Sequence, residues 1–186
     1  MKPISYIRNE RHCLIRLATQ NDAKSLVSVR LQIDQETDYL DREPGEGILD
    51  EKSFRQLIEH DSSTTNRLFL VAEVDGKLVG FARCEGSSLA RKSHTVEFGV
   101  GILQAYWGLG LGSAILRYNL DWARTSRIHK INLSVMETNE KAIALYERYG
   151  FEVEGRLRDD KLIDGQYFDT ILMGHLIQSG TIPENK

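Results

Sequence analysis

The chain has 186 residues, 41% of them hydrophobic, which suits one compact domain with a substantial core. Its formal net charge is −3 and it has no basic block, so no nucleic-acid-binding surface is expected. No apolar run approaches the roughly 20 residues of a membrane span, and residues 1–11 lack the apolar core of a signal peptide. We therefore expect a cytoplasmic protein without a membrane partner. The two cysteines and five histidines lack ligand-like spacing, so we expect neither disulfides nor a metal site.

The first half of the chain predicts a strand, two helices and a hairpin. A strand is expected over 13–17, and a helix then starts at a capping box formed by Thr19 and Asp22. A second helix is expected over about 51–60, with apolar residues on one face. Two apolar strands then flank Asp75-Gly76, the preferred dipeptide of a two-residue hairpin turn.

The second half predicts alternating strands and helices followed by another hairpin. The expected elements are a strand over 94–102, a helix from the glycine-rich turn to about residue 126, a strand over 130–135, a helix over 139–149 ended by Gly150, and a hairpin around Asp164-Gly165. Residues 178–186 are expected to fray. Because strand, turn, helix and strand follow one another over 94–135, these two strands should be parallel neighbours in a mixed sheet. The whole pattern predicts one α/β domain over 1–186, with an ordered core of about 12–177.

The stretch AYWGLGLGSA, residues 105–114, brings a strand into the first turn of a helix through three alternating glycines. Unpaired N–H groups and the helix dipole favour an anion there, and missing side chains let a phosphate approach the backbone. No lysine follows Gly112, so a P-loop does not fit. Ser113 stands where a dinucleotide fingerprint needs its third glycine. A turn without any ligand remains the alternative.

A second motif points to a family. The segment ETNEKAIALYERYGF, residues 137–151, together with WGLGLG thirty residues earlier, resembles the GNAT superfamily of N-acetyltransferases. Within that superfamily, the sequence is most similar to the branch that contains spermidine acetyltransferases and ribosomal-protein N-terminal acetyltransferases. The resemblance departs from the family pattern at Trp107, where an arginine or glutamine is usual. It implies a mixed, mostly antiparallel sheet of about seven strands flanked by helices, with a parallel strand pair splayed around the cofactor.

The resemblance also implies a ligand, acetyl-coenzyme A, with its pyrophosphate on the backbone amides of the glycine-rich turn. The pantetheine should pair with the preceding strand, where Gly99 and Gly101 would leave the surface open. The cofactor-binding residues implied in this way are Val100, Gly101, Ile102, Trp107, Gly108, Leu109, Gly110, Leu111, Gly112, Ser113, Asn139 and Tyr146.

Two residues are candidates for the chemistry. The resemblance implies that Tyr146 protonates the departing thiolate, whereas its helical spacing alone favours core packing. Glu97 stands at a strand position where family members often place a base that acts through water, and a structural carboxylate is the alternative. Asn139 is expected to cap a helix, since asparagine is a preferred cap residue, and a cofactor contact there can coexist with capping.

The acceptor is suggested by charge. Residues 34–51 contain eight acidic residues against Arg42 alone, so this segment could attract a cationic amine, unless it is simply a solvated acidic loop. The sequence thus predicts direct acetyl transfer to a primary amine such as a polyamine. A peptide N-terminus is an alternative acceptor, and a non-catalytic coenzyme A-binding domain is an alternative function. A homodimer is left open.

Overall fold

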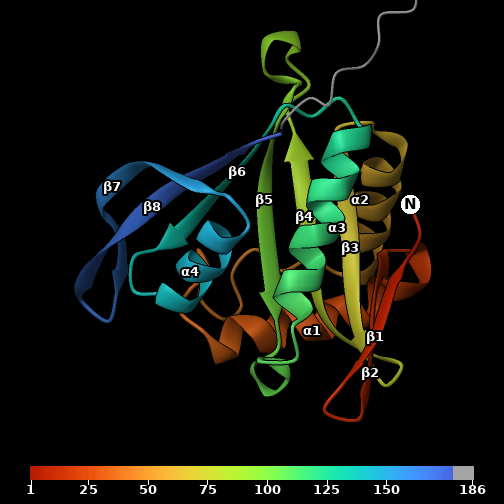
Figure 1. The fold of residues 1–186 in the computed structure, drawn as a ribbon. Helices are drawn as coiled ribbons and strands as arrows, with labels where there is room; N and C mark the ends of the chain where they lie inside the picture. The colour runs from red at the N-terminus through yellow and green to blue at the C-terminus, as the bar shows by residue number, and fades with distance from the viewer. Residues whose placement is uncertain (178–186) are drawn as a thin grey trace, which may run out of the picture.

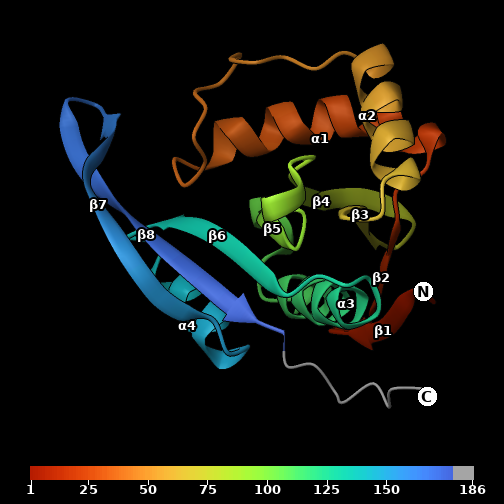
Figure 2. The same ribbon diagram turned by 90° about the horizontal axis from the view of Figure 1, so that it is seen from above.

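The computed structural model describes residues 1–177 as a mixed eight-stranded sheet with helices on both faces (Figures 1 and 2). The strands are β1 (Ile4–Arg8), β2 (Arg11–Leu17), β3 (Arg67–Val74), β4 (Lys77–Gly86), β5 (Thr95–Ile102), β6 (Lys130–Met136), β7 (Glu152–Ile163) and β8 (Gln166–Leu176). The helices are α1 (Ala23–Glu36), α2 (Glu51–Ser63), α3 (Leu111–Thr125) and α4 (Glu140–Arg148), with short 3-10 turns η1 (Gln20–Asp22), η2 (Ala90–Lys92) and η3 (Gln104–Tyr106). Residues 178–186, expected to fray, lie outside the described residues.

The strand order is β1-β2-β3-β4-β5-β6-β8-β7, and all neighbours are antiparallel except β5 and β6. This confirms the predicted mixed, mostly antiparallel sheet and its parallel pair. The sheet has one strand more than expected and begins at Ile4, before the expected start of the ordered core at residue 12. The additional strand is β1, which pairs with β2 so that Ile4 lies opposite Ile15.

Helices cover both faces of the sheet. Figure 2 shows α1 and α2 on one face and α3 and α4 on the other. The buried side chains of α3, among them Ile115 and Tyr118, recur at helical spacing, because one side of the helix rests on the sheet. No helix within residues 1–177 is both long enough and apolar enough to cross a lipid bilayer.

Local signals in the sequence are confirmed where they are strong. Thr19 and Asp22 form the predicted capping box, which opens η1 and leads into α1. The dipeptides Asp75-Gly76 and Asp164-Gly165 form the two hairpin turns, with positive φ at every one of these positions. One boundary differs from expectation: α1 continues to Glu36, so Asp34 lies in a helix and is buried rather than in an acidic loop.

The parallel pair opens into a gap. The paired positions of β5 and β6 run from Thr95 opposite Lys130 to Glu97 opposite Asn132, and the two strands separate beyond them. On its far side β6 continues to pair with β8 as far as Met136. The second half of β5 is therefore bordered by β4 alone in the sheet, and the opening between the strands positions the candidate site (Figure 1).

Candidate active site

The glycine-rich turn before α3 needs glycine at two positions. Gly108 and Gly110 both have φ +81°, a left-handed conformation that side-chain-bearing residues rarely adopt, and Gly110 is the N-cap of α3. Leu109 and Leu111 between them are buried and fix the turn to the core. A Cβ at Gly108 would meet no atom within 4 Å, so its backbone faces open space. The turn thus presents a bare backbone at a helix N-terminus, as the sequence predicted.

The unexpected strand β1 brings two side chains to this turn. The Tyr6 hydroxyl donates a hydrogen bond to the Leu109 carbonyl oxygen at 3.1 Å, and burial raises the pKa of Tyr6 to about 12. The Arg8 guanidinium lies 3.2 Å from the position that a Cβ of Gly110 would occupy. Arg8 forms no ion pair or side-chain hydrogen bond with any residue in 1–177. Neither residue was predicted as part of the site, although the alternation of apolar and polar residues in ISYIR is a weak signal for a strand.

The open edge of β5 carries the residues expected to border the pantetheine. Gly99 faces open space, as expected. Gly101 does not: a Cβ there would lie 3.2 Å from Ile33 Cδ1, so this glycine makes room for α1. Val100 and Ile102 are half-buried at the separated end of the strand. The Trp107 indole N–H donates a hydrogen bond to the Ile102 carbonyl oxygen at 2.7 Å, which fixes the ring beside this edge.

Tyr146 on α4 is 8% exposed and packs between two aromatic rings. Its ring meets Phe98 edge to face at 6.4 Å between centroids and lies 5.8 Å from Phe151. Burial raises the pKa of Tyr146 to about 12, so its hydroxyl stays protonated at neutral pH. That hydroxyl forms no hydrogen bond with any other residue of the described chain. The packing interpretation is thus correct for the ring, while the hydroxyl is left available as a proton donor.

Glu97 lies on the other face of β5 from Tyr146. Its neighbours Val96 and Phe98 are buried while Glu97 is exposed, as alternation along a strand requires. The Asn132 amide on β6 donates a hydrogen bond to Glu97 Oε1 at 3.0 Å, so the partner of Glu97 on the neighbouring strand is a neutral amide. Tyr146 and Glu97 therefore lie on opposite faces of the sheet, close to the point where β5 and β6 separate.

Asn139 is confirmed as the cap of α4. Its side-chain oxygen accepts a hydrogen bond from the Ala142 N–H at 3.3 Å. The helix places Tyr146 two turns further on, where its ring contacts Phe98 of β5. Capping by Asn139 therefore fixes the start of the element that carries the candidate acid.

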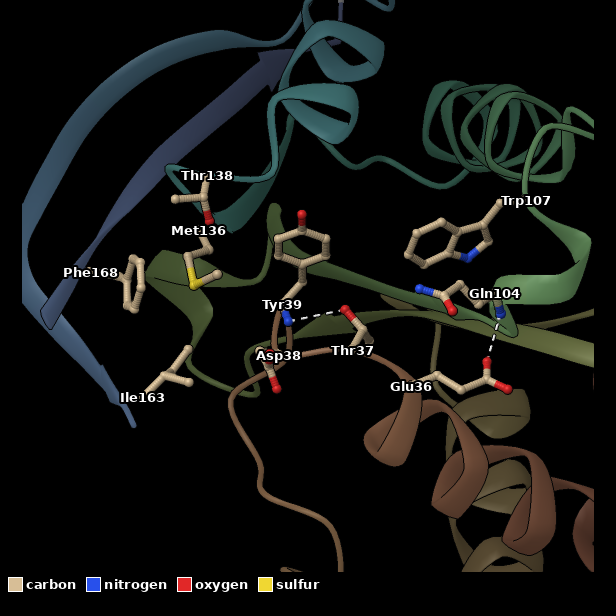
Figure 3. A pocket seen from close by; sticks show the side chains of 10 residues that line it. All are labelled: Glu36, Thr37, Asp38, Tyr39, Gln104, Trp107, Met136, Thr138, Ile163 and Phe168. Carbon is tan, nitrogen blue, oxygen red and sulfur yellow. Dashed lines mark hydrogen bonds between the residues drawn. The ribbon is translucent and has the colours of Figure 1, made fainter. Parts of the chain in front are cut away.

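A pocket of about 430 Å³ lies at the mouth of this gap (Figure 3). Its lining residues come from the end of α1, from η3 and the glycine-rich turn, and from the ends of β6, β7 and β8 (Glu36, Thr37, Asp38, Tyr39, Gln104, Trp107, Met136, Thr138, Ile163 and Phe168). Figure 3 shows the rings of Tyr39 and Trp107 facing one space, with the Gln104 side chain between them. The lining combines two carboxylates with three aromatic rings and includes no lysine or arginine.

Most carboxylates of segment 34–51 already form ion pairs or hydrogen bonds. Their partners are Arg42 and Arg30 for Asp34, the Gln104 N–H and Gln32 for Glu36, Lys161 for Asp41, the Glu43 N–H for Glu46, the Ser53 N–H for Asp50, and Arg55 for Glu51. Asp38 and Glu43 have no side-chain partner within residues 1–177, and Asp38 lines the pocket. In the same part of the chain, no three or more His, Cys, Asp or Glu side chains gather as a metal site would require.

Comparisons with known proteins agree with this geometry. Residues 33–151 match the family model described as Acetyltransferase (GNAT) family. The chain is 33% identical to spermidine N(1)-acetyltransferase of Escherichia coli K12 over 136 residues, which is 73% of this chain and 70% of that protein. It is 32% identical to the L-amino acid N-acetyltransferase AaaT of the same organism over 108 residues, which is 58% of this chain and 67% of that protein.

Solved structures share the fold. A GNAT-family acetyltransferase of Streptococcus pneumoniae superposes with a TM-score of 0.86 at 30% identity, covering 89% of this chain and 99% of that one. The acetyltransferase yncA of Salmonella typhimurium, solved with acetyl-CoA, has a TM-score of 0.79 at 22% identity, covering 94% and 99%. The second similarity concerns the fold alone.

Proposed function

Because the chain belongs to the GNAT family of acetyltransferases and is therefore an acyltransferase, we propose that it moves an acetyl group from acetyl-coenzyme A directly to a primary, cationic amine. Acetyl-coenzyme A, when bound, supplies an activated acetyl thioester. The chain's residues supply the binding surfaces, the charge of the acceptor pocket and the proton transfers. A metabolite of the cell interior as cosubstrate suits the cytoplasmic location expected from the sequence.

The residues present fit the cosubstrate. The bare backbone at Gly108 faces open space and the N-terminus of α3 favours phosphate, while Arg8 adds a positive charge beside Gly110. This arginine offsets the departure at Trp107, where the family pattern usually has an arginine or a glutamine. The unpaired edge of β5 at Val100–Ile102 offers backbone groups to an extended pantetheine.

The acceptor class rests on one observation, the lining of the 430 Å³ pocket. Its size lies within the usual range for small ligands, roughly 300–1,000 Å³. Carboxylates and aromatic faces both attract an ammonium group, and Tyr39, Trp107 and Phe168 supply the faces. An amino-acid acceptor would bring its own carboxylate, and the lining offers that carboxylate no cation. The pocket therefore favours a polyamine-like acceptor over an amino acid.

The acceptor's ammonium group first releases one proton to water, so that its nitrogen has a free electron pair for attack. The transfer then forms one bond and breaks another, with two further proton movements. The amine nitrogen bonds to the acetyl carbon, and the carbon–sulfur bond breaks with its electron pair on sulfur. Burial keeps the Tyr146 hydroxyl protonated, and in this proposal Tyr146 gives that proton to the sulfur. Glu97, held by Asn132, takes up the proton that the amine loses, through a bridging water.

An acceptor panel tests this proposal. Purified protein is mixed with acetyl-coenzyme A and with spermidine, a simple diamine, several amino acids or a short peptide, and release of free thiol is followed. We expect turnover with the polyamine and diamine and little with amino acids. Faster turnover of amino acids would contradict the acceptor class, and peptide turnover alone would favour N-terminal acetylation.

Binding without turnover is the remaining alternative. Isothermal titration with acetyl-coenzyme A is therefore run beside the panel. Binding together with no thiol release for any acceptor would indicate a coenzyme A-binding domain that lacks catalysis. Absence of binding would contradict the cosubstrate itself.

A further inference from the structure

The strand β7 ends the sheet and leaves one edge without a neighbour. β8 pairs with one side of β7, and no strand of the described chain follows on the other side. Figure 2 shows β7 along the outer rim of the hairpin, away from α1 and α2. A long exposed edge presents unpaired backbone donors and acceptors, so it either carries features that prevent pairing or has a partner.

The sequence of this edge is complementary to itself. Residues 152–158 read EVEGRLR, with two acidic residues before Gly155 and two basic residues after it. Suppose that two copies of β7 run antiparallel about a twofold axis at Gly155. Each residue of one copy then lies opposite the residue of the other copy that is the same number of positions away on the other side of Gly155. The resulting pairs are Glu152 with Arg158, Val153 with Leu157, and Glu154 with Arg156, and each pair occurs twice.

The side chains needed for this pairing are accessible. Val153 is 57% exposed and Leu157 is 43% exposed, although both are large apolar residues. Glu152 and Arg158 form no ion pair or hydrogen bond through their side chains with the rest of residues 1–177. Glu154 binds Lys130, and Arg156 binds Asp169 and Glu137, but the side chains of Glu154 and Arg156 remain about half exposed.

Gly155 is not required by the fold of a single chain. Its φ lies outside the left-handed region, and a Cβ would meet nothing closer than Leu172 Cδ1 at 3.6 Å, an ordinary contact. Glycine inside a strand weakens it and often marks a place where another backbone approaches closely. At the axis of two antiparallel copies, the two Gly155 backbones would face each other.

We propose that a second copy of this chain pairs along β7, antiparallel about Gly155, so that the sheets of two copies join at their edges. Such a contact uses the same patch on both copies, as a twofold interface requires. Irregularities in the β7–β8 register lie between Val153 and Gly155 and between Leu157 and Lys161. The first irregularity falls inside the self-complementary stretch, at Glu154, and the second starts after Leu157 and so includes Arg158. The inference is independent of the acetyl transfer proposed above.

Charge reversal tests the pairing through Glu152 and Arg158. By sedimentation velocity over a concentration series, we expect the wild type to form dimers. Glu152→Arg alone and Arg158→Glu alone should each raise the dimer dissociation constant by about tenfold or more, because both copies then oppose like charges. Mixing the two single variants, or combining both changes in one chain, restores opposite charges and should restore dimers. Glu59→Arg on α2, an exposed residue far from β7, is the matched control.

Some outcomes overturn the proposal. A wild type that stays monomeric at every concentration would show that the charges and bulges of β7 serve to keep this edge unpaired. Dimers that are equally stable in both single reversals would place the interface elsewhere. Loss of dimers that neither mixing nor the double reversal restores would show that Glu152 and Arg158 do not face each other.

A cysteine at the axis gives a second test that does not depend on charge. The native Cys13 and Cys84 are both buried, so Gly155→Cys introduces an accessible thiol. Directly opposed residues of antiparallel strands lie roughly 4.5–5.5 Å apart between Cα atoms, within disulfide range. Mild oxidation should therefore link Gly155→Cys into dimers and leave Glu59→Cys largely monomeric. Equal linking of both variants, or linking of neither, would overturn the proposal.

Discussion

Tyr146 is the residue at which packing and chemistry can be separated. Its ring fills a cavity beside Phe98 and Phe151, while its hydroxyl has no partner within residues 1–177. Tyr146→Phe should therefore leave the melting temperature and acetyl-coenzyme A affinity nearly unchanged, since no buried group loses a hydrogen bond. If the hydroxyl protonates the departing sulfur, single-turnover rates should fall by about 10²–10⁴-fold. A normal rate in a well-folded variant would exclude Tyr146 as the acid.

The raised pKa of Tyr146 also predicts how the free energy of unfolding changes at alkaline pH. Burial raises the pKa of Tyr146 from 10.0 to about 12, so the folded state favours the neutral phenol. The resulting stability is fully present below pH 10 and is lost as pH rises towards 12. A shift of about two pH units corresponds to roughly 3 kcal/mol. Urea unfolding of wild type and Tyr146→Phe should thus show a constant difference below pH 10, then a loss in the wild type alone. Parallel curves would contradict the buried phenol.

At the scale of elements, the glycine-rich turn and β5 each contain a glycine next to open space, but only the glycine of the turn is required by the backbone conformation. Gly108 has φ +81° and open space around it, whereas Gly99 has open space without a left-handed backbone. Gly108→Ala should lower the free energy of unfolding by about 1–2 kcal/mol, and Gly99→Ala should change it by less than about 0.5 kcal/mol. Titration with acetyl-coenzyme A well below the melting temperature then measures binding separately. Unchanged affinity in folded Gly108→Ala would favour a purely structural turn.

β1 makes its own contribution to the turn through Arg8. Because Arg8 is exposed and lies beside Gly110, Arg8→Ala should weaken acetyl-coenzyme A binding by about two- to five-fold at low salt, and by less at high salt. Arg55→Ala on α2 is the control, since Arg55 pairs with Glu51 far from the turn. A salt-independent loss, or an equal loss in the control, would show that Arg8 does not meet the phosphates.

How far the elements could be predicted depended on the strength of their local signals. The two hairpins and α4 were predictable, because Asp-Gly turns and a capping asparagine act within a few residues. β1 was not, because five residues at an edge carry too little apolar alternation to stand out from a polar terminus. The roles of Gly101 and Trp107 were also out of reach, since they depend on Ile33 and on the Ile102 carbonyl, which only the folded chain brings together.

At the scale of the whole molecule, the acidic segment 34–51 was predicted either to attract a cationic amine or to be a solvated acidic loop, and most of its carboxylates have partners within the described chain. Six of its eight carboxylates bind arginine, lysine, glutamine or backbone N–H groups, so they stabilise α1, α2 and their connection. Composition alone could not separate such carboxylates from free ones, because the partners include residues as distant in sequence as Gln104 and Lys161. What is left to act on an acceptor is Asp38 at the pocket and Glu43 outside it.

The last prediction follows from that division. If the pocket attracts a cation, Asp38→Asn should raise the KM for spermidine by about two- to five-fold at low salt, and added salt should reduce the difference. Glu43→Gln removes the same charge outside the pocket and should have a smaller effect, which makes it the matched control. Asp41→Asn instead removes the ion-pair partner of Lys161 on β7 and should disfavour a cationic acceptor through the charge of that unpaired ammonium. Steady-state kinetics at two ionic strengths measure all three. Equal effects of Asp38→Asn and Glu43→Gln would indicate a general surface charge, and no effect of either would make the segment a bystander to acceptor binding.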